Sequence, residues 1–282
     1  MSDGMSLSAT VPIRDLPDHL LANGHPVITT ERAADLTGLN RRSIHAGLTR
    51  LKSKGRIFSP ARGLYVPIPP EYRSWRVVPA EWFVDAMMRH LHRRYYVGLL
   101  SAAAIHGASH HAPQVFQVMV DRQIGDRDLE RVRLRFHVNR LLEHHALALP
   151  VQTRNTHTGT IVVASPELTA VDIARHPRSS GGLHNVANVL VELPRLDENE
   201  LGGLAALYPR VVARRLGWLL ETFADYTDLE RLRAVAAPHD GQPVPLSASG
   251  PRRGRRDDHW GLIINAAVEP EVEPEVEGPD LR

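Results

Sequence analysis

The sequence of 282 residues contains no cysteine. This absence excludes disulfide frameworks, thiolate zinc sites and thiol nucleophiles. Long apolar runs are also missing, since no stretch approaches the roughly 18 consecutive apolar residues that a membrane span requires. The opening stretch lacks the basic segment followed by an apolar run that is typical of a secretory signal. We therefore expect a soluble, cytoplasmic protein that does not contact a membrane.

Acidic residues are absent from one part of the chain, although acidic and basic residues nearly balance overall and give a formal net charge of +2. Between Asp35 and Glu71 no acidic residue occurs, whereas this stretch holds five arginines and the only two lysines of the chain. This bias indicates a basic surface near the N-terminus. Residues 241–282 end in an acidic Glu-Pro-Glu-Val repeat and are predicted to be a disordered tail.

The first 70 residues carry the pattern of a winged helix-turn-helix. Apolar spacing and capping residues predict helices over residues 15–21, from Thr29 or Thr30 to Gly38, and from Arg41 to about Lys54. Two β-prone runs, 56–58 and 64–66, flank a Pro/Gly turn and predict a hairpin. The short glycine-containing turn 37–40 is typical of a helix-turn-helix. We therefore assign residues 1–70 to a DNA-binding domain of this type.

The third predicted helix has one apolar and one basic face. Ile44, Leu48 and Leu51 form an apolar stripe that faces the core, which leaves the opposite side exposed. The basic start of this helix can enter the major groove, while flanking cations contact phosphates. We predict groove contacts from Arg41, Arg42, His45, Thr49 and Arg50. We predict phosphate or wing contacts from Ser43, Lys52, Lys54, Arg56 and Arg62.

The stretch Pro67-Ile68-Pro69-Pro70 marks a domain boundary. Beyond it, helices are predicted over residues 80–94 and 96–105, followed by strands over 115–120, 132–138, 151–155 and 160–163. Further helices are predicted from Pro166 onward and over residues 182–193, 197–208 and 209–224. Residues 71–240 are thus predicted to form one mixed domain. The predicted fold class is α+β, with an N-terminal winged helix-turn-helix followed by a mixed α/β C-terminal domain.

The sixteen histidines do not form the pattern of a metal centre. The pairs His110-His111 and His144-His145 are adjacent in sequence, so their side chains do not converge on one ion. No P-loop, no GxGxxG after a strand and no GxSxG occurs. Asp121 and Asp126 flank a loop instead of sharing a strand face, which is typical of turn residues. We predict no catalytic residue, no metal and no cofactor.

Four segments occur in the order in which a known protein family carries them. They are the run Tyr95–Gly107, the block Ser165–Asp172 (Ser-Pro-Glu-Leu-Thr-Ala-Val-Asp), the helix start Gly181-Gly182-Leu183 and the run Arg214–Glu221 (Arg-Arg-Leu-Gly-Trp-Leu-Leu-Glu). Together with the leading winged helix, they resemble the AbiEi family, the antitoxin and transcriptional-regulator half of abortive-infection toxin–antitoxin pairs. The resemblance covers roughly residues 10–235.

This resemblance implies a transcriptional regulator whose partner is double-stranded DNA. Such a protein represses its own operon by binding inverted repeats in its promoter through the winged helix. Its second domain, residues 71–240 here, would act as the antitoxin against a nucleotidyltransferase toxin of the AbiEii type.

Two alternatives belong to other functional classes. A nucleotidyltransferase also carries a helix that ends in an apolar-His-Gly motif, as in Ile105-His106-Gly107. Such an enzyme needs a Gly-Ser element together with an Asp-x-Asp strand to hold its two metals, and no Gly-Ser element follows Gly107. We therefore predict no enzyme activity and interpret His106 as a hydrogen-bonded residue at a helix end. The other alternative is a winged helix that binds only another protein, and salt-dependent DNA affinity separates the two.

Overall fold

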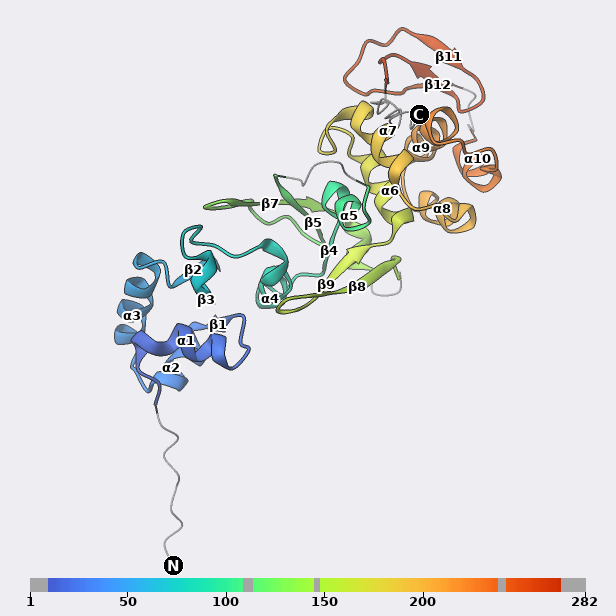
Figure 1. Ribbon diagram of the computed structural model, residues 1–282. Coiled ribbons are helices and arrows are strands. Elements are labelled where there is room, and N and C mark those ends of the chain that lie inside the picture. Colours follow the sequence, from blue (N-terminus) through green and yellow to red (C-terminus); the bar gives the residue numbers. More distant parts are fainter. Residues whose placement is uncertain (1–9, 109–113, 145–147, 238–241, 270–282) are drawn as a thin grey trace, which may run out of the picture. The chain divides into compact units, whose positions relative to one another are not determined.

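The computed structural model describes residues 10–108, 114–144, 148–237 and 242–269 (Figure 1). The chain divides into two compact units, one built from Met1–Val97 and Gln114–Val163, the other from Gly98–Pro113 and Ala164–Arg282. The first unit combines the winged helix with a larger sheet, so the sequence-based boundary at residue 70 does not separate the two units. Among the described helices, none combines the length and apolarity needed to cross a bilayer.

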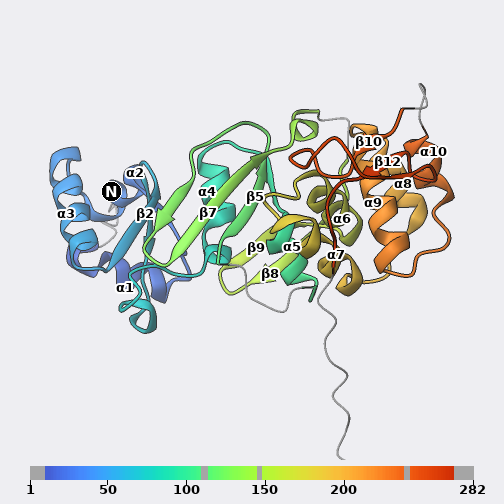
Figure 2. The same cartoon turned by 90° about the horizontal axis from the view of Figure 1, so that it is seen from above.

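The first unit begins with the element order of a winged helix-turn-helix (Figures 1 and 2). After a 3-10 turn come α1 (Leu16–Ala22), β1 (Ile28–Thr29), α2 (Thr30–Thr37), α3 (Arg41–Ser53), β2 (Ile57–Ala61) and β3 (Leu64–Pro67). The three strands form an antiparallel sheet in the order β1-β3-β2. The three predicted helices and the hairpin are confirmed, and the short strand β1 is an addition to them.

Capping residues define the turn between α2 and α3. The Thr29 hydroxyl accepts a hydrogen bond from the backbone amide of Arg32 at 3.2 Å, which begins α2. Gly38 ends this helix at a φ of 66°. The Asn40 side chain then accepts a hydrogen bond from the amide of Ser43 at 2.9 Å and begins α3. Because one helix ends and the next begins within a few residues, α3 leaves the turn in a defined direction.

The core of the winged helix is built from apolar side chains of its helices and strands. Its buried members are Leu16, Leu20, Ile28, Ala33, Ile44, Leu48, Leu51 and Ile57. Gly47 lets α3 approach the preceding 3-10 turn, because a β-carbon there would lie 2.5 Å from Cγ1 of Ile13. The apolar stripe of α3 therefore faces inward, as predicted, and the opposite side of the helix faces solvent.

The hairpin differs from the prediction at its turn. Strand β2 continues to Ala61, so the turn consists only of Arg62 and Gly63, with Gly63 at a φ of 80°. The register shifts between Phe58 and Ala61. This irregularity accommodates Pro60, which cannot donate a hydrogen bond to the ladder. The wing is therefore tighter than the predicted turn of five residues.

Two predicted helices after the winged helix differ from the structure. Residues 80–94 hold a 3-10 turn and the shorter α4 (Val84–His90), because Phe83 leaves helical geometry at a φ of −134°. The helix predicted from residue 96 begins later, as α5 (Leu99–Ile105), and strand β4 (Tyr95–Val97) precedes it. Aromatic and β-branched side chains fit a pleated sheet, which explains the strand.

The first unit also contains a six-stranded mixed sheet (Figure 1). Its strands are β4, β5 (Phe116–Val120), β6 (Arg127–Leu129), β7 (Val132–Val138), β8 (Val151–Thr156) and β9 (Gly159–Ala164), in the order β6-β7-β5-β4-β9-β8. Strand β4 runs antiparallel to β5 and parallel to β9, while β5 runs parallel to β7. The four predicted strands are confirmed, and β4 and β6 are additions.

The second unit is mostly helical. Its helices are α5, α6 (Pro166–Arg175), α7 (Gly182–Glu192), α8 (Glu198–Ala205), α9 (Arg210–Phe223) and α10 (Glu230–Ala236). The start of α6 is as predicted, since the Ser165 hydroxyl accepts a hydrogen bond from the amide of Leu168 at 3.2 Å and Pro166 lies in the first turn. The predictions of α7, α8 and α9 are confirmed, and α10 is an addition.

The end of the second unit contradicts the predicted disordered tail over 241–282. Strands β10 (Val244–Pro245), β11 (Arg255–Asp257) and β12 (Leu262–Ile264) form a three-stranded sheet within residues 242–269. Trp260 is buried, and its indole Nε1 donates a hydrogen bond to Oε2 of Glu221 in α9 at 2.5 Å. Packing of this large aromatic side chain against α9 thus contributes to the order of the segment. The acidic repeat from residue 270 onward lies outside the described residues.

Two buried arginines of α9 hold this C-terminal segment by its backbone. The guanidinium of Arg214 donates to the carbonyl oxygen of Gly261 at 3.2 Å. The guanidinium of Arg215 donates to the carbonyl oxygen of Leu246 at 3.0 Å, and burial lowers the pKa of this side chain. The Arg-Arg-Leu-Gly-Trp segment that the sequence analysis singled out therefore has a structural role.

Gly217 of α9 provides the space for Trp260, because a β-carbon at this position would overlap the indole ring. Replacing Gly217 with alanine is expected to lower the free energy of unfolding by about 1–3 kcal/mol, the usual effect of overpacking a core. Urea unfolding of the full chain, followed by circular dichroism, measures this change. Gly203→Ala in α8 is the matched control, since a β-carbon there meets nothing within 4 Å. Equal effects of the two substitutions would contradict this packing.

Candidate nucleic-acid interface

The outward side of α3 carries the predicted groove residues. Exposed on it are Arg41, Arg42, His45, Thr49 and Arg50. Ala46, which lies among them, is small, and Ser43 at the edge of this face is half-buried. A helix whose exposed face is basic and free of bulky apolar side chains can lie in the major groove of DNA.

The start of α3 and the tip of the wing line one groove of about 670 Å³. Arg41 and His45 of α3 line it together with Arg62 of the wing. Glu31 contributes a carboxylate to the groove lining. The pKa of this carboxyl is lowered by a hydrogen bond with its own backbone and another with Thr29. Two arginines against one carboxylate give the groove a positive charge, which suits an anionic ligand.

The backbone of the wing is held in place within the first unit. Nε2 of His90, at the end of α4, lies 2.9 Å from the carbonyl oxygen of Arg62. On strand β2, the carbonyl oxygen of Pro60 accepts a hydrogen bond from the guanidinium of Arg127 at 3.2 Å. The exposed side chain of Arg62 is therefore presented from a fixed backbone.

Arg56, one of the predicted phosphate or wing contacts, forms an ion pair within the winged helix. Its Nη2 donates a hydrogen bond to Oδ1 of Asp18 at 2.7 Å, and its side chain is 24% exposed. Spacing cannot indicate this ion pair with α1, because Asp18 lies 38 residues earlier.

The end of α3 gains a cation that the sequence analysis missed. Lys52 and Lys54 are exposed there, as predicted contacts should be. Arg76 joins them, since its Nη2 donates hydrogen bonds to the carbonyl oxygens of Ser53 at 3.1 Å and of Lys52 at 3.4 Å. A cation at the last carbonyls of a helix is favourable. No pattern in the sequence identifies Arg76, because its contact with α3 is long-range.

Other polar residues considered from the sequence have structural roles. Nε2 of His106 lies 2.7 Å from the carbonyl oxygen of Ala164, which confirms His106 as a hydrogen-bonded helix-end residue. Asp121 and Asp126 each accept a hydrogen bond from a backbone amide. Across the ranges that the structure describes, no group of three His, Cys, Asp or Glu could hold a metal ion. Three of the paired histidines lie outside these ranges, namely His110, His111 and His145.

A solved structure has the same fold. The RV2827C protein from Mycobacterium tuberculosis matches over 93% of this chain and 95% of that chain, with a TM-score of 0.63 and 15% sequence identity. The comparison with curated proteins found no match.

Two family models match the chain in the order of its parts. The model described as transcriptional regulator, AbiEi antitoxin, matches residues 15–68, which run from the start of α1 to the end of the wing. The model described as AbiEi antitoxin C-terminal domain matches residues 96–222, which run from β4 to α9. The chain therefore belongs to the AbiEi family of antitoxins and transcriptional regulators.

Proposed function

We propose that this protein is a DNA-binding autorepressor and the antitoxin of a toxin–antitoxin pair. It binds inverted repeats in its own promoter and counteracts a nucleotidyltransferase toxin. Membership of the AbiEi family supports both roles. The observation that supports DNA binding most directly is the groove in which the basic start of α3 meets Arg62 of the wing.

The exposed cations make two kinds of DNA contact, one with base edges and the other with phosphates. Arg41 and Arg42 enter the major groove with the start of α3, where a guanidinium can pair with both acceptors of a guanine. Lys52 and Lys54 contact phosphates at the other end of α3, and such contacts position a protein without reading the sequence. Arg62 reaches a flanking phosphate from the wing. Bound in this way at its promoter, the protein blocks transcription of its own operon.

The antitoxin role belongs to the part of the chain beyond the winged helix. The match of residues 96–222 to the C-terminal domain of AbiEi antitoxins supports this assignment. This part starts after the DNA-contacting residues, so a substitution in α3 leaves its sequence intact. Repression and neutralisation of the toxin are therefore separable by substitution.

A binding titration on the DNA upstream of its own gene, against scrambled DNA of equal length, tests the proposal at two salt concentrations. We expect tighter binding to the upstream DNA. With the three proposed phosphate contacts, doubling the salt concentration lowers the affinity roughly sixfold. Equal affinity for both DNAs would contradict sequence-specific repression. No binding at either salt concentration would favour a winged helix that binds only protein.

A further inference from the structure

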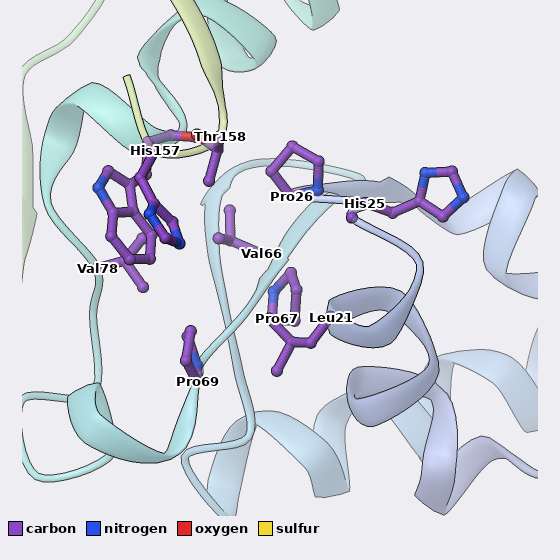
Figure 3. Close-up of a pocket in the computed structure, with 11 residues that line it drawn as sticks. Leu21, His25, Pro26, Val66, Pro67, Pro69, Val78, His157 and Thr158 are labelled. Carbon is purple, nitrogen blue, oxygen red and sulfur yellow. The ribbon is translucent and has the colours of Figure 1, made fainter. Parts of the chain in front are cut away.

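A small apolar pocket lies at the base of the wing, within the first unit (Figure 3). Its volume is about 130 Å³. It lies among the α1–β1 connection, the end of β3 with the residues that follow, and the turn between β8 and β9. The apolar residues that line it are Leu21, Pro26, Val66, Pro67, Pro69, Val78 and Trp82. None of them belongs to the proposed DNA contacts.

One wall of this pocket is aromatic. The imidazole of His157 stacks on the indole of Trp82, with ring centroids 4.3 Å apart and an angle of 19° between the rings. The hydroxyl of Thr158 donates a hydrogen bond to the carbonyl oxygen of Trp82 at 2.7 Å, which holds the β8–β9 turn against this wall. The flat face of a ligand ring can stack on such a surface.

The facing wall is preformed. Figure 3 shows Pro26 and Pro67 across the pocket from His157 and Val78. Proline rings have a fixed φ and lose little freedom when a ligand arrives. An apolar cavity of about 150 Å³ holds one benzene ring. The size of this pocket therefore matches a ligand with a single aromatic ring.

The polar groups at the pocket select the substituent on that ring. Two histidines, His25 and His157, line the pocket, and none of its lining residues is acidic. In Figure 3 the imidazole of His25 lies at the outer side, away from His157. An imidazole can donate a hydrogen bond to a carboxylate and gains positive charge when protonated. An acidic substituent is therefore favoured over an amine.

We propose that this pocket binds a small aromatic carboxylate with a single ring. The ring lies between the Trp82–His157 pair and the prolines, and the carboxylate lies beside the His157 imidazole. The pocket adjoins the wing, because Val66 and Pro67 are the last residues of β3. Occupancy is therefore expected to change the affinity for DNA, a consequence that rests on the proposed function.

Benzoate is the probe, titrated by isothermal calorimetry into the full chain without DNA. We expect saturable binding of one benzoate per chain. Benzylamine has the same ring with a positive charge, and cyclohexanecarboxylate has the charge without the aromatic ring. Each is expected to bind at least about fivefold more weakly than benzoate, a difference of roughly 1 kcal/mol. Equal binding of benzylamine would overturn the assignment of an acidic ligand.

Two substitutions locate the binding. His157→Ala removes an exposed ring and is expected to weaken benzoate binding at least about fivefold, whereas Leu21→Trp fills the pocket and is expected to abolish it. His144→Ala is the matched control, since this histidine is also exposed and does not line the pocket. No saturable binding to the unmodified chain, or equal affinity of the His157 and His144 variants, would overturn the proposal.

A second titration measures the affinity of the protein for the upstream DNA with and without benzoate. A change in DNA affinity of more than about threefold that Leu21→Trp removes would support coupling between the pocket and DNA. Unchanged DNA affinity with benzoate bound would overturn the coupling. Benzoate binding by a chain that binds no DNA would overturn the proposed function and leave the pocket assignment intact.

Discussion

Replacing Leu48 with alanine is expected to lower the free energy of unfolding of the winged helix by about 2–5 kcal/mol. Leu48 is 1% exposed and belongs to the core that also contains Leu16, Leu20 and Ile44. The substitution removes apolar contacts and leaves a cavity in a small core. Because domains are typically stable by only about 5–15 kcal/mol, this loss is a large share of the total. Urea unfolding of the full chain, followed by circular dichroism, measures it.

Thr49→Ala is the matched control for this substitution. Thr49 is the next residue of α3 and is exposed, so its replacement should change the stability by no more than about 0.5 kcal/mol. The Leu48 variant is expected to lose DNA binding together with its structure. If it unfolded no more readily than the Thr49 variant, the inward orientation of the α3 stripe would be wrong.

Arg42→Ala is expected to weaken binding to the upstream DNA by about 1–3 kcal/mol while the stability stays unchanged. Arg42 is exposed in the first turn of α3, where a guanidinium can reach a base edge. The loss should be confined to the upstream DNA, because scrambled DNA lacks the base that the guanidinium reads. The titration on upstream and scrambled DNA, repeated with this variant, measures both affinities.

Arg154→Ala provides the control for charge removal, since this exposed arginine lies on β8 outside the winged helix. It should leave the DNA affinity unchanged. An equal loss on upstream and scrambled DNA would reassign Arg42 to a phosphate contact. In cells, the Arg42 variant should lose repression of a reporter behind its own promoter and still neutralise the toxin. Loss of both activities would contradict their separation.

The winged helix could be predicted because its signals are local. Thr29, Gly38 and Asn40 cap helices through hydrogen bonds or a backbone conformation within a few residues. The apolar stripe of α3 follows from the helical period alone. Both kinds of signal are complete in a single sequence, and the structure confirms the elements that they predict.

The errors arose where long-range contacts decide the structure. Tyr96 and Val97 have an apolar pattern that fits a helix or a strand, and pairing with β5 makes them a strand. Residues 242–269 are held by contacts with α9, among them the hydrogen bond between Trp260 and Glu221, which lies 39 residues earlier in the sequence. Long-range contacts also surround the proposed DNA contacts, because Arg56 is paired with Asp18 and Arg76 reaches the end of α3 from outside the charged run.

The central place of β4 in its sheet determines the order in which a nascent chain can fold. The winged helix ends with β3 at Pro67, so all of its residues are synthesised early. Strand β4 needs β5 on one side and β9 on the other, and β9 ends only at Ala164. A ribosome-bound chain that stops before β9 therefore joins a completed winged helix to a strand with one open edge. A pause of translation in this interval is therefore expected to leave this edge exposed to aggregation and available to a chaperone.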